Sequence, residues 1–266
     1  MKRWIPFIKK PPMVAVIRLN GAIASGGRGN TLNDAGLAPI IERAFRKAKP
    51  AAVALVINSP GGSPAQSSLI GARIRRLAEE RDIKVYAFVE DVAASGGYWL
   101  ACAADEIWVD PSSIVGSIGV IYSGFGFHDF IGKHGVERRV HTAGKSKSML
   151  DPFRPENPKD IARLQVWQQQ IHDTFIDHVK SRRGARLSDN PDLFTGDVWV
   201  GANSIEVGLA DGVAHIVPKM KEIFGDKVRF ANYGQKRSLF QRIGASLASD
   251  ALGIAEERAL YSRFGL

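Results

Sequence analysis

Hydrophobic positions along the chain alternate between short apolar runs and segments with helical spacing. Val14–Leu19, Val53–Ile57 and Val85–Val89 are predicted to be strands, and the second is apolar throughout, as is typical of a strand buried on both faces. Apolar residues recur every three or four positions over 37–48 and again over 70–77, which predicts an amphipathic helix after each of the first two strands. This alternation predicts an α/β domain with a mainly parallel sheet and helical crossovers.

Shorter elements are expected beyond the third strand. A short helix should follow Ser95, and further strands are expected at Ile107–Val109, near Ile118–Ile121 and at Val136–Thr142. Apolar residues at helical spacing from Ile161 onward predict a long helix that ends near residue 184. The chain contains no internal repeat and no low-complexity segment.

The pattern and the charge together predict three segments. A basic tail covers residues 1–12, the α/β domain covers 13–217, and a basic, partly helical extension covers 218–266, with the boundary near Pro218. Of the net charge of +9, the first segment carries four basic residues and no acidic one, and the last carries nine basic and five acidic residues. The domain between them is nearly neutral, whereas a nucleic-acid enzyme usually has its basic surface on the folded domain, so nucleic acid is not an expected partner.

The basic tails indicate where the protein acts. Trp4, Phe7 and Ile8 are interleaved with lysine and arginine in the first tail, a composition that fits contact with an anionic membrane surface, and plain solubilising tails are the alternative. No apolar run approaches the roughly 18–20 residues that cross a bilayer, and the N-terminus lacks the apolar core of a secretory signal. A cytoplasmic location, or a peripheral one on the membrane surface, is therefore expected.

Metal and disulfide chemistry are not expected. The single cysteine, Cys102, excludes an intrachain disulfide and lies in an apolar stretch typical of a small buried thiol. The six histidines show no convincing metal-ligand spacing. We therefore expect no metal and no cofactor.

Two glycine-rich turns follow predicted strands. Asn-Ser-Pro-Gly-Gly-Ser at 58–63 closes one strand, and Ala-Ala-Ser-Gly-Gly-Tyr at 93–98 follows another and opens a helix. Glycine allows the backbone to approach a ligand closely, and free N–H groups at a helix start can bind a developing oxyanion. Ser95 lies where a nucleophile is expected, at a sharp strand-to-helix turn, although a serine there is often only a helix N-cap.

A serine nucleophile needs a base. None of the six histidines stands in a recognisable catalytic setting, and Lys147 lies in a segment expected to leave a strand. A lysine acts as base only when its pKa falls towards neutrality, which burial among apolar groups achieves. Three apolar neighbours could provide such surroundings, Met149, Leu150 and Phe153. Spacing alone does not choose between Lys147 and Lys145, and each could simply be a solvated surface charge.

Four motifs in a fixed order carry a resemblance to a known family. They are the segments at 58–62 (Asn-Ser-Pro-Gly-Gly), 94–98 (Ala-Ser-Gly-Gly-Tyr) and 116–120 (Gly-Ser-Ile-Gly-Val), and the Lys147 segment followed by Asp-Pro-Phe. With them the chain resembles signal peptide peptidase A, the Ser–Lys branch of the ClpP/crotonase superfamily. The resemblance covers about residues 13–217. It implies repeated β-β-α units with a mainly parallel sheet.

The resemblance also implies roles for individual residues. It assigns Ser95 as nucleophile, Lys147 as general base, Ser117 as the hydroxyl that orients the base, and Gly61, Gly62 and Gly96 as the oxyanion-hole positions. Which N–H of the Gly61–Gly62 turn points inward stays open. The family forms ring- or dome-like homo-oligomers in which base and nucleophile can come from neighbouring protomers. This chain departs from the family in residues 144–146, where many relatives have an acid and an aromatic, and in the expected lack of an N-terminal membrane anchor.

The main functional hypothesis is a serine endopeptidase that hydrolyses hydrophobic peptides, such as signal-peptide remnants or membrane-protein segments. One alternative is a crotonase-type acyl-CoA enzyme with acidic catalysts, for which Glu90 and Asp91 are the nearest candidates in sequence. The other is a catalytically silent scaffold that binds membrane proteins through its basic tails.

Overall fold

The computed structural model describes residues 11–26, 31–47, 49–144, 146–234 and 258–266. These divide into two compact units, of which unit 1 comprises the chain up to Ile118 and from Ile176 onward, and unit 2 comprises Gly119–Phe175. Residues 1–10 of the basic N-terminal tail and residues 235–257 of the C-terminal extension lie outside the described residues, and so does Lys145.

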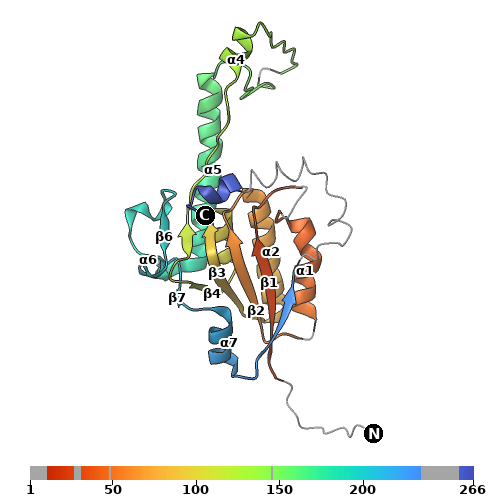
Figure 1. The fold of residues 1–266 in the computed structure, drawn as a ribbon, viewed down its shortest axis with the longest axis vertical. Helices are drawn as coiled ribbons and strands as arrows, with labels where there is room; N and C mark the ends of the chain where they lie inside the picture. The colour runs from red at the N-terminus through yellow and green to blue at the C-terminus, as the bar shows by residue number, and fades with distance from the viewer. Residues whose placement is uncertain (1–10, 27–30, 48, 145, 235–257) are drawn as a thin grey trace. The chain divides into compact units, whose positions relative to one another are not determined.

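Unit 1 is built on one sheet (Figure 1). Its strands are β1 (Met13–Asn20), β2 (Ala52–Ser59), β3 (Val85–Ala94), β4 (Glu106–Val109), β5 (Ile114–Gly116), β6 (Val198–Val200), β7 (Gly212–Val213) and β8 (Arg229–Tyr233). The order is β6-β5-β3-β2-β1-β8, and β4 pairs with both β3 and β7. Every pair is parallel except β5–β6. The predicted α/β class with a mainly parallel sheet is confirmed.

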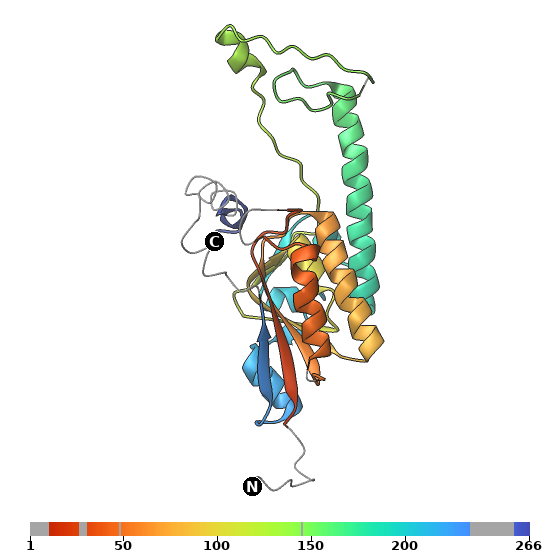
Figure 2. The ribbon, with the colours of Figure 1, turned by 90° about the vertical axis from the view of Figure 1, so that its right-hand side faces the viewer.

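Helices connect and cover the strands of unit 1. They are α1 (Asp34–Arg46), α2 (Pro64–Arg81), α3 (Gly96–Ala101), α6 (Ala202–Glu206) and α7 (Ile216–Phe224), with short 3₁₀ turns at Gly184–Arg186 and Pro191–Phe194. Figure 2 shows α1 and α2 side by side on one face of the sheet. Unit 2 contains α4 (His128–Lys133), and α5 (Pro158–Arg183) begins in unit 2 and ends in unit 1.

Local sequence explains why the first helices begin where they do. The Asn33 side chain caps α1 by accepting a hydrogen bond from the Gly36 N–H at 2.8 Å. The Ser63 side chain caps α2 in the same way, and Pro64 occupies the first helical position, where no N–H is needed. The helix expected over 70–77 is therefore confirmed as part of a longer helix, and the helix expected over 37–48 is confirmed as far as Arg46, where α1 ends.

The core lies around the central strands. Residues 52–57 of β2 are all buried, as the continuous apolar run predicted, because β1 and β3 flank this strand and helices cover the sheet. Val14–Ile17 of β1 are likewise buried. None of the described helices combines the length and the apolar character that a membrane span requires.

Two strand predictions are wrong. The strand expected near 118–121 lies earlier, at β5, where it pairs with the end of β3. The segment 136–142 forms no strand and is mostly exposed, and Val136 is 56% accessible. The described residues of unit 2 include no strand with which this segment could pair, so its apolar residues do not form a ladder. Lys147 therefore does not follow a strand.

The boundary expected near Pro218 is not where the sheet ends. Pro218 lies inside α7, and β8 beyond it pairs with β1 in parallel register from Met13↔Arg229 to Ile17↔Tyr233. Residues up to Tyr233 thus belong to the sheet of unit 1. The separate unit 119–175 was not anticipated from the sequence.

Candidate active site

Ser95 occupies the sharp turn between β3 and α3. Its φ of 52° and ψ of −123° lie in a region that non-glycine residues rarely adopt, at a cost of about 1–3 kcal/mol. The Ser95 N–H donates to the Gly116 carbonyl at 2.8 Å, and the Trp99 N–H donates to the Ser95 carbonyl at 3.0 Å. These bonds hold the strained turn from both sides.

The Ser95 hydroxyl is available for chemistry. The residue is partly exposed although its neighbours Ala94 and Gly96 are buried. Its side chain caps no N–H of the described helix α3, so the N-cap role that the sequence left open does not apply.

The Gly61–Gly62 turn lies directly against Ser95. A Cβ at Gly61 would lie 2.7 Å from the Ala94 carbonyl oxygen and 2.8 Å from both the Gly96 nitrogen and the Ser95 Cβ. A Cβ at Gly96 would lie 3.4 Å from the Gly62 nitrogen. The structure therefore brings together four of the predicted site residues, and glycine at 61 is what allows the two turns to meet.

Hydrogen bonds distinguish the two N–H groups of this turn. The Gly61 N–H donates to the Ser59 Oγ at 3.3 Å, and the Gly61 carbonyl accepts from the Ile23 N–H at 2.8 Å. The C=O and N–H of a trans peptide point in opposite directions, so the Gly62 N–H points away from Ile23. Within the described chain, neither the Gly62 N–H nor the Gly96 N–H donates to another protein group.

Ser117 is placed next to this turn by the sheet. Ala94 of β3 pairs with Gly116 of β5, and the Gly116 carbonyl accepts the Ser95 N–H. Ser117 is the residue that follows Gly116. Ser117 has a φ of 52° and is held by its own N–H, which donates to the Asp197 carbonyl at 2.7 Å. The residue is partly exposed.

Lys147 belongs to unit 2, whereas the other predicted site residues belong to unit 1. It lies in an exposed turn, where its N–H donates to the Gly144 carbonyl at 3.2 Å. Two of its expected apolar neighbours, Met149 and Leu150, are partly buried, and Phe153 is 36% exposed. The partnership of Lys147 with Ser95 stays a prediction.

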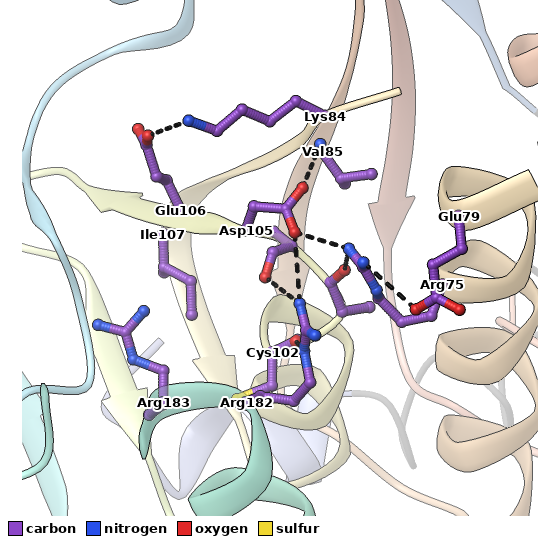
Figure 3. Close-up of polar contacts among 12 residues, drawn as sticks. Arg75, Glu79, Lys84, Val85, Cys102, Asp105, Glu106, Ile107, Arg182 and Arg183 are labelled. Carbon is purple, nitrogen blue, oxygen red and sulfur yellow. Dashed lines mark hydrogen bonds and ion pairs between the residues drawn. The ribbon is translucent and has the colours of Figure 1, made fainter. Parts of the chain in front are cut away.

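Side chains of α5 and α2 hold the far end of α3 (Figure 3). Arg182 donates through Nε to the Cys102 carbonyl at 2.8 Å and through Nη2 to the Ala104 carbonyl at 3.0 Å. Asp105 lies between Arg182 and Arg75, at 3.5 Å and 2.8 Å respectively. Cationic donors at the C-terminal end of a helix satisfy its last carbonyls, so this network anchors the helix that begins after Ser95.

The remaining titratable groups near α3 have structural roles. Burial raises the pKa of the Cys102 thiol to about 12, so the thiol stays protonated, as expected for a small buried cysteine. His178 stacks on Trp99 with ring centroids 4.3 Å apart, and burial lowers the pKa of this imidazole. Among the described residues, no group of His, Cys, Asp and Glu side chains gathers as a metal site.

The sequence missed the residues that support the Gly61–Gly62 turn. Ser59 is fully buried at the end of β2, and its hydroxyl donates to the Gly21 carbonyl at 2.7 Å. Ile23 follows β1 and forms a parallel bridge to Gly62. Residues 21–23 lie close to the turn because β1 pairs with β2. This long-range pairing cannot be inferred from a local motif.

Curated relatives include several proteases. The chain is 32% identical to the probable protease SohB of Haemophilus influenzae over 76% of this chain and 57% of that protein. It is 30% identical to the putative protease slr0021 of Synechocystis sp. over 74% and 68%. It is also 48% identical to a Brucella melitensis protein named Na(+)/H(+) antiporter NhaA, in a match that spans all of this chain and 39% of that protein. The chain thus spans between about two fifths and two thirds of these relatives.

The fold and the family model agree with these matches. The 1510-N membrane-bound stomatin-specific protease, solved in complex with a substrate peptide, superposes with a TM-score of 0.54 at 16% identity over 90% of this chain and 99% of that structure. This likeness confirms the ClpP/crotonase-like fold. The model of peptidase family S49 matches residues 78–222. The chain belongs to peptidase family S49, the family of the signal peptide peptidase A proteins that its motifs resemble.

Proposed function

We propose that the protein is a serine endopeptidase with Ser95 as nucleophile and Lys147 as general base. The observation that carries the proposal is the strained turn at Ser95, which lies against two N–H groups without a protein acceptor in the described chain, those of Gly62 and Gly96. Such a pair beside a nucleophile is the arrangement that stabilises a tetrahedral oxyanion. Membership of peptidase family S49 supports the assignment.

The reaction proceeds in two steps. The Ser95 Oγ bonds to the substrate carbonyl carbon while Lys147 accepts the hydroxyl proton, and the Lys147 ammonium then protonates the leaving amine as the C–N bond breaks. Water attacks the resulting ester with Lys147 again as base, which releases the acid product and restores Ser95. No cofactor takes part in either step.

The oxyanion hole is assigned to the N–H groups of Gly62 and Gly96. The Gly61 N–H already donates to Ser59, so Gly61 contributes through its missing side chain and not as a donor. Ser117 has the role of orienting Lys147, because it lies beside the Ser95 turn with a partly exposed hydroxyl.

The active species is proposed to be a homo-oligomer, a ring or a dome, in which dyads are shared between protomers. Lys147 is exposed in its own unit, and a lysine that serves as base needs a dry site. A neighbouring protomer packed over this turn would exclude water and bring Ser95 to Lys147.

Hydrophobic peptides are the proposed substrates, encountered at a membrane surface. Apolar side chains stay exposed in the same unit as Lys147, with Phe125 81% and Phe130 62% accessible. A membrane or a signal peptide also features in the names of two relatives and of the structural neighbour, which are a putative signal peptide peptidase, an antiporter and a membrane-bound protease. Signal-peptide remnants and membrane-protein segments fit this description.

The acyl-CoA alternative lacks a free acid in the described site. Glu90 pairs with Arg18 at 3.0 Å, and the Asp91 carboxylate accepts from the Asn58 amide. Both acids that the crotonase-type alternative offers are thus engaged by partners, whereas the Ser95 turn lies against the two N–H groups that a serine peptidase uses.

Hydrolysis of a fluorogenic tripeptide amide that ends in leucine tests the proposal. The wild-type chain should cleave it and should be labelled by a fluorophosphonate, and Ser95→Ala should lose both properties. Ser112→Ala removes an exposed hydroxyl from the turn after β4 and should change neither. Cleavage by Ser95→Ala at the wild-type rate would overturn the assignment, and a folded wild-type chain that cleaves no peptide would favour the silent scaffold.

A further inference from the structure

Ser59 has a buried hydroxyl that the proposed mechanism leaves without a role. Its Oγ donates to the Gly21 carbonyl at 2.7 Å and accepts from the Gly61 N–H at 3.3 Å, so one hydroxyl joins the loop after β1 to the turn after β2. We propose that Ser59 is a positioning residue, which holds the turn so that the Gly62 N–H faces the oxyanion. This inference rests on the proposed peptidase function.

Gly61 is held at both of its peptide units. The Pro60–Gly61 unit is fixed by the N–H that donates to Ser59, and the Gly61–Gly62 unit is fixed by the carbonyl that accepts from Ile23. The second unit carries the Gly62 N–H. The orientation of this second peptide plane relative to the first depends on the φ and ψ of Gly61. Both angles are restrained as long as both peptide units keep their hydrogen bonds.

Two consecutive glycines make this support necessary. Gly61 has a φ of 98° and Gly62 a φ of 140°, and neither has a side chain that limits rotation. Gly61 is buried, so its N–H has no water to replace Ser59 as acceptor. A buried N–H without an acceptor is unfavourable, and a Gly–Gly turn can rotate to find another partner. Loss of the Ser59 hydroxyl would therefore leave the Gly61–Gly62 peptide held by its bond to Ile23 alone, and the Gly62 N–H would be less firmly directed at the oxyanion.

Ser59 also touches the other half of the oxyanion hole. The β2–β3 pairing shifts register after Ile57, and Ser59 pairs with Ala93, two residues before Ser95. A Cβ at Gly97 would lie 2.4 Å from the Ser59 carbonyl oxygen, so the start of α3 packs directly on Ser59. One residue thus contacts the elements that carry both proposed donors.

The Ser59→Ala variant of the full chain tests the role through a pair of ligands. A peptide aldehyde forms a hemiacetal with Ser95 and needs the oxyanion hole, whereas the matching peptide alcohol binds the same subsites without an oxyanion. We expect kcat for the leucine-ending amide to fall about tenfold, less than the roughly 10²–10³-fold loss when an oxyanion donor is removed outright. Affinity for the aldehyde should fall by the same factor, while KM and affinity for the alcohol stay within about twofold.

Two further variants separate positioning from stability. Ser204→Ala removes another fully buried hydroxyl that donates to a backbone carbonyl, that of Gly201 at 2.6 Å, and should leave kcat and both affinities unchanged. Ser59→Cys keeps a side chain of similar volume with a weaker hydrogen-bonding group. It should show the same loss in kcat in a folded protein, even if Ser59→Ala lowers the melting temperature.

Retention of full kcat by Ser59→Ala or Ser59→Cys would overturn the inference. An equal loss of affinity for the aldehyde and the alcohol would also overturn it, because that result describes general damage to the site. The peptidase assignment is tested separately by Ser95→Ala, so failure of the Ser59 role does not affect it.

Discussion

Gly61 and Ser95 are so close that residue 61 cannot carry a side chain. A Cβ at Gly61 would meet the Ser95 Cβ at 2.8 Å, together with two backbone atoms of the β3–α3 turn. Real Cβ atoms do not approach so closely, so one of the two turns would have to move. The conformation of the proposed nucleophile is thus coupled to the absence of side-chain atoms at position 61.

The Gly61→Ala variant should consequently lose activity. The added methyl group would displace the Ser95 turn or the Gly62 N–H, and we expect kcat to fall by about 10² or more, comparable to loss of an oxyanion donor. Gly225→Ala is the matched control, because Gly225 has a φ of 85° with nothing within 4 Å of a Cβ. Its ψ is 163°, a conformation essentially confined to glycine, so the variant should lose about 1–3 kcal/mol of unfolding free energy from backbone strain alone and keep its kcat. Measured kcat near the wild-type value for Gly61→Ala would contradict the predicted coupling.

A second prediction concerns the identity of the base. Lys147→Ala should abolish peptide hydrolysis in a protein that remains folded, because Ser95 then has no group to accept its proton. Lys133→Ala removes a lysine at the end of α4 in the same unit and should retain activity. Lys145→Ala should keep most of it as well. Steady-state kinetics on the three variants decides the assignment, and an inactive Lys145→Ala beside an active Lys147→Ala would make Lys145 the base.

The Arg183–Asp211 pair should make stability depend on pH. Burial by itself raises the pKa of Asp211, but hydrogen bonds from Arg183 and from the Ile107 N–H outweigh it and hold this pKa below the usual value of 3.8. A carboxyl with a lowered pKa in the folded state stabilises the protein above 3.8, and that contribution is lost as the pH falls through the folded-state pKa. The pair should therefore stabilise fully at pH 7 and not in strong acid.

Asp211→Asn tests this by denaturant unfolding at several pH values. The Arg183 side chain is only 2% exposed, so the variant leaves a buried cation without its partner and should lose about 3–5 kcal/mol at pH 7. The difference from wild type should shrink as the pH falls below 3.8. Asp226→Asn alters a carboxylate that is 95% exposed and should leave the free energy of unfolding unchanged. A constant difference between Asp211→Asn and wild type at all pH values would refute the linkage.

The strands that the sequence predicted correctly are those with local signals. Residues 53–57 are apolar throughout because β2 is covered on both faces, and the glycines after Ser95 mark a helix start without reference to the rest of the chain. Strand β8 (Arg229–Tyr233) gave no such signal. Among the described strands it pairs with β1 alone, at the edge of the sheet, and most of its residues are not buried. Its place in the sheet follows from long-range pairing, which a local pattern does not contain.

Only those parts of the candidate site that lie in local sequence motifs could be predicted from the sequence. Ser95, Gly61 and Gly96 stand in motifs, and each motif is a turn that the chain forms locally. The acceptor of the Gly61 N–H depends on Ser59, whose side chain is fixed by the loop after β1. The segment 136–142 was wrongly predicted to be a strand, because β-branched residues such as Val136, Val140 and Thr142 favour a strand only where a partner strand is present.

The final prediction is that dyads are shared between protomers. Ser95 belongs to unit 1 and Lys147 to an exposed turn of unit 2, so an interface that covers this turn would complete the site. Mixing inactive Ser95→Ala and Lys147→Ala proteins under conditions of subunit exchange should then restore activity, because some interfaces join an intact Ser95 to an intact Lys147. In a closed ring assembled at random from equal amounts, about one interface in four carries both intact residues, so recovery should approach a quarter of the wild-type rate.

The control for complementation keeps both lesions in one chain. A Ser95→Ala/Lys147→Ala double variant mixed with either single variant cannot form an intact dyad across or within protomers, and these mixtures should stay inactive. Analytical ultracentrifugation of the wild-type chain should show an oligomer at the concentrations at which activity is measured, with specific activity falling as dilution dissociates it. A wild-type chain that retains full specific activity as a monomer would refute the shared dyad, since each protomer would then bring its own Lys147 to its own Ser95.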